Sequence, residues 1–285
     1  MLTHQSARPK SSSIASSICR QDDTLSSPVR FSVSHTENVL PPGGILDLSL
    51  QISSGMPAHA SFPPPLVEPF ATHESTVKEG LGTDLDPHSY AVNRLTMLEH
   101  VGTHVDAPLH FGPAGAAIDE LDLDWFHGPA LCLDLRHIPD LGDIDATDLA
   151  AAERAAGVRV ERHIVLICTG FHARHWPYPD VVTTNPGLTA EATHWLADRG
   201  SRAHGVEGPS TDRAGSREFP NHRACRDRGL IHYEWLVGLE HLLGVGQFYF
   251  MGFPMKIAHG TGSPVRALAV IGGPNVPTGT APAQR

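Results

Sequence analysis

The spacing of apolar residues after residue 44 predicts a chain that mixes strands with helices. Alternating or continuous apolar runs are typical of strands, whose side chains point to opposite faces with a period of two. A shorter strand followed by a loop is expected within 203–212. The longer runs predict strands at 45–52, 90–98, 130–138, 163–171, 248–257 and 263–272.

Other segments carry helix or loop signals. DATDLAAAERAAGV (145–158) has a capping Asp, an alanine-rich body and a terminal Gly, and LTAEATHWLADRG (188–200) also ends in Gly. FPNHRACRDRGL (219–230) predicts a loop with a short helix. The Pro-containing segments 56–70 and 172–187 predict loops. Because strands and helices follow no steady βαβ period, a single mixed α/β domain is favoured over a Rossmann sheet.

The ends of the chain differ from this folded part. Residues 1–43 are Ser-rich and lack an apolar period, which predicts disorder. A transit peptide is the alternative, because basic residues precede the first acid, Asp22. We therefore expect a disordered tail at 1–43, a folded domain at 44–275 and a short flexible tail at 276–285.

Composition narrows the classes of partner. A net charge of −10 argues against nucleic acid, which needs clustered Lys and Arg. No apolar run approaches the roughly 18 residues that read as a membrane span. The four cysteines form no CxxC pair, which fits a reducing, cytoplasmic setting. Histidine, the commonest metal ligand, occurs 19 times.

One stretch, LEHVGTHVDAPLH, concentrates these histidines. His100, His104, Asp106 and His110 all stand at even positions. A fully extended strand would place residues 100 and 104 about 13 Å apart, too far for two ligands of one metal. Gly102, β-branched neighbours and a proline oppose a continuous helix. The segment must therefore bend, and Gly102 is the residue that permits a turn or bulge.

A bent segment with the spacing His-x3-His-x-Asp predicts a metal site. The alternative is a solvated strand face whose histidines are incidental. Ser210 and Asp212 in GPSTD could suggest a serine nucleophile, but no GxSxG motif surrounds the serine. We interpret these two residues as lining or bracing the site.

The chain resembles the cyclase family of metal-dependent hydrolases, which includes bacterial kynurenine formamidase and isatin hydrolase. HVGTHVDAPLHF resembles the family signature HxGTHxDxPxH, and LDLSLQISSGMP its opening strand and Gly-Met-Pro turn. IVLICTGF, NPGLTAEATHWLADRG, GVEGPSTD, FPNHRACRDRGLIHYEWLVGLEHL and GFPMKIAHGTGSPVRALAV are similar to later segments. The resemblance runs from about Ile45 to Ile271 and implies a mixed-sheet, swivelling β/β/α domain.

The resemblance also implies roles for the residues of the motif. His100, His104 and Asp106 are the implied metal ligands, and Asp106 could bridge two ions. His110 matches the histidine that acts as general base in the family. For His110, the alternative is a fifth ligand or a group that orients Asp106.

The remaining family ligands are a later histidine and a glutamate twelve residues beyond it. His222 and Glu234 have that separation here. From the residues alone His222, His232 and His241 are all candidates, and the family spacing favours His222. A buried structural role for His222 is the alternative.

Such a site implies hydrolysis by metal-activated water, with two divalent ions, Zn or Mn, as cofactors. The expected substrate is a small molecule, an aryl formamide or a cyclic amide. A cyclase or lactonase acting on a secondary metabolite is the runner-up, and a non-catalytic metal-binding protein is the rival from another class. Two departures from the family, a missing Trp-Pro-Gly and Glu207 in place of the usual Asp, indicate a different substrate pocket. The resemblance further suggests a homodimer or homotetramer.

Overall fold

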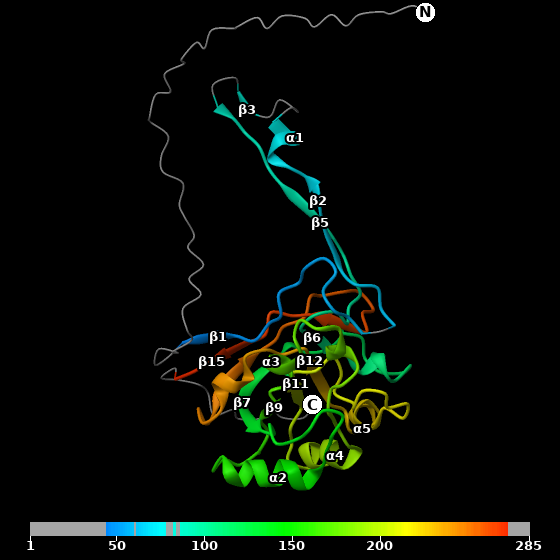
Figure 1. The fold of residues 1–285 in the computed structure, drawn as a ribbon, viewed down its shortest axis with the longest axis vertical. Coiled ribbons are helices and arrows are strands. Elements are labelled where there is room, and N and C mark those ends of the chain that lie inside the picture. The colour runs from blue at the N-terminus through cyan, green and yellow to red at the C-terminus, as the bar shows by residue number, and fades with distance from the viewer. Residues whose placement is uncertain (1–43, 60, 78–81, 84–85, 273–285) are drawn as a thin grey trace, which may run out of the picture. The chain divides into compact units, whose positions relative to one another are not determined.

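A nine-stranded mixed sheet carries most of the fold in the computed structural model, which describes residues 44–59, 61–77, 82–83 and 86–272. The central neighbours from β7 to β12 run parallel, and the outer neighbours run antiparallel. β1 and β15, from opposite ends of the described chain, lie side by side (Figure 1). The strand order is β1 (Ile45–Asp47), β15 (Leu268–Val270), β13 (Phe248–Met251), β7 (His127–Asp134), β9 (Ile164–Cys168), β11 (Ala203–Val206), β12 (Ile231–Glu234), β6 (His104–Asp106) and β14 (Gly262–Pro264).

The sheet buries both of its faces, and strand β9 shows how. Ile164 and Leu166 belong to one apolar cluster, whereas Val165 and Ile167 belong to another. Because successive side chains point to opposite faces, a strand covered on both sides needs a continuous apolar run. The run IVLIC meets that need, and all five of its residues are buried.

Helices cover the face to which Val165 and Ile167 point. Helix α2 (Ala146–Ala155) is capped by Asp145, whose carboxylate accepts the backbone N–H groups of Thr147 and Asp148. α2, α4 and α5 supply apolar side chains to the same cluster as these two strand residues. The remaining helical segments are α1 (His73–Val77), α3 (Phe171–His175), α4 (Ala190–Asp198), α5 (Pro220–Arg228) and the 3₁₀ turns η1 (Pro108–His110), η2 (Leu123–Trp125), η3 (Pro179–Val182) and η4 (Leu239–Leu242).

Three short two-stranded sheets complete the described chain. β10 (Gly187–Leu188) pairs with β8 (Asp143–Ile144), and β3 (Gly82–Thr83) with β4 (Asp86–Pro87). β2 (Leu66–Ala71) pairs antiparallel with β5 (Val92–Thr96), and the register shifts between Pro69 and Ala71.

The mixed α/β class and the two long helices are confirmed, but some predicted boundaries were wrong. The predicted loop at 56–70 contains most of β2, because a bulge accommodates Pro69 in an outer strand. The predicted loop at 172–187 contains helical turns, and the predicted strand at 263–272 is split into β14 and β15. The tail predicted at 1–43 and the one at 276–285 lie outside the described residues. Among the described residues, no helix combines the length and the apolar character that crossing a membrane requires.

Candidate metal centre and active site

The register of the sheet brings acids and histidines onto one face. Across β12 and β6, His232 pairs with Asp106 and Glu234 pairs with His104. Residues directly opposite each other in neighbouring strands have side chains on the same face. Four chemically active side chains that are distant in sequence therefore become neighbours, and all four are buried.

The bend predicted before β6 is present at Gly102. This glycine has a φ of +70°, a left-handed conformation that glycine adopts without strain. The turn lets His100 fold back, so that its Nδ1 lies 2.7 Å from Oδ1 of Asp106. Gly262 in β14 leaves the space for this ring, because a Cβ there would lie 2.6 Å from Cε1 of His100.

Helix α5 supplies His222 to the same cluster. Nε2 of His222 lies 3.5 Å from Oδ2 of Asp106 and 3.6 Å from Oε1 of Glu234. The Asp212 carboxylate accepts the backbone N–H of Asn221 at 2.6 Å and also the Nδ1 proton of His222. Asp212 therefore fixes the ring that faces the acids, which agrees with the bracing role predicted for it.

Hydrogen bonds on the outer side of the cluster determine which nitrogen of each imidazole carries the proton. Nδ1 of His104 faces the carbonyl oxygen of Gly102 at 2.8 Å, so it must carry the proton. Its Nε2 then presents a lone pair, 3.2 Å from Oδ1 of Asp106 and 3.5 Å from Oε2 of Glu234. Both facing atoms are acceptors.

The rings of His100 and His222 follow the same rule. The hydroxyl of Thr261 donates to Glu99 at 2.7 Å, so it accepts the Nε2 proton of His100 at 2.9 Å. Nδ1 of His222 donates to Asp212. Each of these three rings, when neutral, consequently turns an unprotonated nitrogen toward Asp106 or Glu234.

Imidazole lone pairs and carboxylates facing one another repel unless positive charge lies between them. Nε2 of His104 and Oδ2 of Asp106 are buried and have no hydrogen-bond partner among the described residues. Imidazole nitrogens and carboxylate oxygens are the donors that Zn²⁺ and Mn²⁺ accept, and outer hydrogen bonds of this kind orient metal-binding histidines. The residues present therefore fit a divalent metal.

The pKa shifts of Asp106 and His104 also indicate that positive charge is favoured between these side chains. Burial opposes ionisation of Asp106, but positive charge on the nearby His232 holds its pKa well below the usual range. Burial would lower the pKa of His104, yet the nearby negative charges of Asp106 and Glu234 raise it. A bound cation would replace the protons that these imidazoles otherwise attract.

His110 occupies a different position from the other predicted site residues. It ends η1, its side chain is 26% exposed, and its ring stacks on His100 with 4.0 Å between centroids. Its Nε2 lies 3.7 Å from Oδ2 of Asp106, beyond a hydrogen bond. Burial lowers the pKa of His110 to about 4, so its ring is neutral at neutral pH.

The structure brings all six predicted site residues together and adds one that the spacing did not select. Nε2 of His232 lies 3.0 Å from Oδ2 of Asp106, closer than that of His222. Strand register, which is not visible in local spacing, places it there. His241, the third candidate, instead lies near Glu240 in η4.

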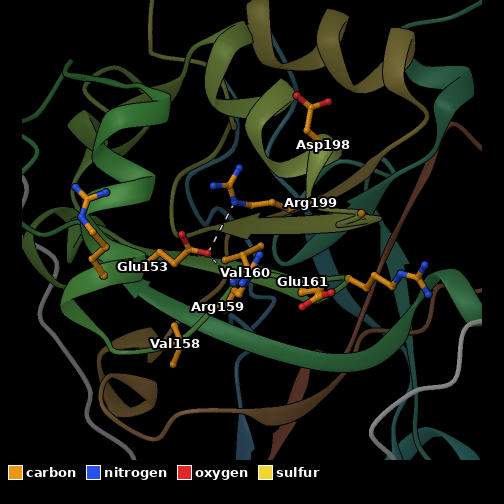
Figure 2. A pocket seen from close by; sticks show the side chains of 10 residues that line it. Glu153, Val158, Arg159, Val160, Glu161, Asp198 and Arg199 are labelled. Atoms are coloured by element: carbon orange, nitrogen blue, oxygen red, sulfur yellow. Dashed lines mark hydrogen bonds and ion pairs between the residues drawn. The ribbon is translucent and has the colours of Figure 1, made fainter.

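Cavities near and far from the cluster differ in chemistry. A larger pocket of about 800 Å³ lies at the ends of α2 and α4 and in the segment before β9. Figure 2 shows charged side chains around it, including the ion pair between Glu153 and Arg199, 3.8 Å apart. No group of metal-binding side chains among the described residues lies there. A cavity of about 10 Å³, roughly the room one water needs, lies instead against Asp106, Ala107, Pro108, His110, Phe111, His222, Cys225, Arg226, Leu230 and His232.

Comparison with known proteins gives one consistent result. The family model "Putative cyclase" matches residues 46–213. The kynurenine formamidase of Bacillus mycoides (strain KBAB4) is 32% identical over 202 residues, covering 70% of this chain and 87% of that protein. Isatin hydrolase A from Ralstonia solanacearum is 25% identical with a TM-score of 0.68, covering 84% of this chain and 100% of that one. An isatin hydrolase bound to the product analogue thioisatinate is 22% identical with a TM-score of 0.69, covering 81% and 93%, and shows the same fold.

Removing Asp106 tests whether the cluster holds metal. We expect Asp106→Ala, and Asp106→Asn with its shape retained, to lose bound divalent metal, because both oxygens of this carboxylate face the histidines. Metal content per chain, measured by mass spectrometry after reconstitution and gel filtration, checks this. Asp124→Ala, at an aspartate whose side chain is 61% exposed, is the control and should keep the wild-type content. Undiminished metal in both Asp106 variants would contradict the assignment.

Proposed function

Because the chain belongs to the cyclase family, we propose that it is a metal-dependent hydrolase that cleaves the C–N bond of an aryl formamide or a cyclic amide. The observation that carries this proposal is the set of unprotonated imidazole nitrogens facing two buried carboxylates. The relatives named above act, by their names, on a formamide and on a cyclic amide. The cytoplasm remains the expected location, and the buried free cysteines Cys132, Cys168 and Cys225 suit a reducing setting.

Two metal ions, Zn or Mn, are the expected cofactor, and the two oxygens of Asp106 support this number. Oδ1 faces His100 at 2.7 Å and His104 at 3.2 Å. Oδ2 faces His232 at 3.0 Å and His222 at 3.5 Å. A carboxylate whose oxygens meet separate pairs of histidines could help to hold two ions, and Glu234, which faces both His104 and His222, could do the same.

The bound ions and His110 would have different roles in hydrolysis. When bound, the ions lower the pKa of a nearby water and stabilise negative charge on the carbonyl oxygen. His110, the most exposed of the six predicted residues and neutral, takes a proton from the attacking water. It returns that proton to the leaving nitrogen as the C–N bond breaks. The products are an amine and a carboxylic acid, which ionises to the carboxylate and releases one proton to solvent, and His110 ends in its starting state.

Aromatic side chains beside His110 support an aryl substrate. The ring of Phe111 lies 4.9 Å from that of His110, edge to face, and 5.2 Å from that of Phe219. Phe219 is 39% exposed, so part of its ring is open to a ligand. An aromatic ring could stack on this pair while its amide faces His110.

Turnover by metal-reconstituted protein tests the proposal. We expect hydrolysis of N-formylkynurenine or isatin, followed as acid release with a pH indicator and abolished by a chelator. His110→Ala should retain its metal and lose about 10²- to 10⁴-fold in kcat, the usual contribution of a general acid–base group. His241→Ala is the matched control and should keep wild-type rates.

Other outcomes would redirect this assignment. Loss of metal in His110→Ala would make His110 a ligand. Turnover of simple lactones alone would favour the lactonase or cyclase alternative. If protein shown to hold metal turns over neither N-formylkynurenine, isatin nor simple lactones, the proposed hydrolysis of aryl formamides and isatin-like amides would be contradicted.

We also propose that the chain forms a homodimer through the β2–β5 hairpin. Leu66 is 44% exposed and Phe70 68%, and Leu95, which is 51% exposed and pairs with Val67, lies on the opposite face from Leu66. The hairpin therefore carries apolar surface on both faces, which two strands cannot bury within themselves. A second copy would cover this surface, as the predicted homodimer or homotetramer requires.

Sedimentation measures this assembly directly. We expect the wild type to sediment as a dimer or larger, and the double variant Phe70→Ser, Leu95→Ser to sediment as a monomer. Leu123→Ser is the control, because Leu123 is 65% exposed but lies in η2, outside the hairpin. A monomeric wild type, or a double variant that assembles normally, would contradict the assigned interface.

A further inference from the structure

A second group of metal-binding side chains lies behind the candidate centre. His204, Cys225 and His232 are 0%, 3% and 3% exposed. Each offers a nitrogen or sulfur atom within 4.8 Å of the others. His204 and Cys225 are outside the set of ligands assigned above, and neither takes part in the proposed hydrolysis.

Strand register and helix periodicity create this group. His204 on β11 pairs directly with His232 on β12, so the two rings share a face and lie 5.6 Å apart at an interplanar angle of 30°. On α5, Cys225 follows His222 by three residues, which places both on one side of the helix. The helix therefore presents a thiol to the two rings while it presents His222 to Asp106.

The group contains polar atoms that the protein leaves unpaired. Nε2 of His204 is 3.1 Å from the side-chain amide of Asn221, but its Nδ1 has no hydrogen-bond partner among the described residues. Nε2 of His232 faces Asp106 at 3.0 Å, but its Nδ1 likewise has no hydrogen-bond partner in the described part of the chain. Buried polar atoms without partners are rare and costly, and a bound ion is one explanation for them.

We propose that His204, Cys225 and His232 form a second site, which binds a thiophilic transition-metal ion such as Zn²⁺. Two imidazoles and a thiolate are a softer set of donors than the imidazoles and carboxylates around Asp106, so this site selects for thiophilic ions. On binding, the Cys225 thiol loses its proton to solvent and the sulfur coordinates the ion. Asn221 is a positioning residue, because its amide contacts both His204 and, at 3.5 Å, the sulfur of Cys225.

His232 connects the two sites. Its Nε2 lies 3.0 Å from Oδ2 of Asp106, and the residue also belongs to the group that holds the Cys225 sulfur within 4.8 Å. The second ion would therefore hold the His232 ring in place beside the catalytic cluster without contacting substrate.

Co²⁺ added to the full-length, metal-free chain distinguishes the two sites, because only a cysteine ligand produces thiolate-to-cobalt charge-transfer absorption in the near ultraviolet. We expect this absorption in the wild type and its loss in Cys225→Ala, with one Co²⁺ fewer bound per chain. His204→Gln, which keeps the thiol, should need more Co²⁺ to reach half of the absorption. Cys168→Ala is the matched control, because Cys168 is also fully buried but belongs to no metal-binding group among the described residues.

An absent band in the wild type, or a band that persists in Cys225→Ala, would overturn the second site. Circular dichroism of each variant shows whether it is folded, and the wild-type titration does not depend on any variant. Turnover separates this inference from the proposed function. Chelator-sensitive hydrolysis without the band would leave the hydrolase and remove the second site, whereas the band without hydrolysis would do the reverse.

Discussion

Positive charge between buried acceptors is the constraint on which the site depends. Asp106 and Glu234 are 3% and 5% exposed, and Nε2 of His104 and of His222 faces them without a proton when the ring is neutral, because Nδ1 of each ring donates outward. Burial of this many acceptors is unfavourable unless a cation compensates them. A divalent metal supplies that charge and also the chemistry of hydrolysis, so stability of the centre and activity have one physical origin.

The backbone of the sheet determines where the side chains of the site lie. The parallel core of the sheet is buried on both faces, which makes the register of β11 and β12 rigid. β6 and β14 extend that sheet, and Gly102 and Gly262 provide the turn and the space that His100 requires. Helix α5 then closes the face with His222, oriented by Asp212.

How much the sequence could predict depended on whether the signal was local. The apolar run of β9 and the capped helix α2 were predictable, and so was the bend at Gly102, since each is encoded by adjacent residues. Strand β2 was missed because prolines obscure its pattern. His222 and Glu234 could be selected only through the family spacing. The places of His204, Cys225 and His232 depend on strand register and helix packing, which no local spacing reveals.

Anomalous diffraction from crystals of the protein reconstituted with Mn or Zn tests the central claim most directly. Coordination bonds to nitrogen and oxygen are about 2.0–2.2 Å long. We expect anomalous peaks at that distance from Nε2 of His104, from Glu234 and from both oxygens of Asp106. Full metal content without a peak between these residues would contradict it.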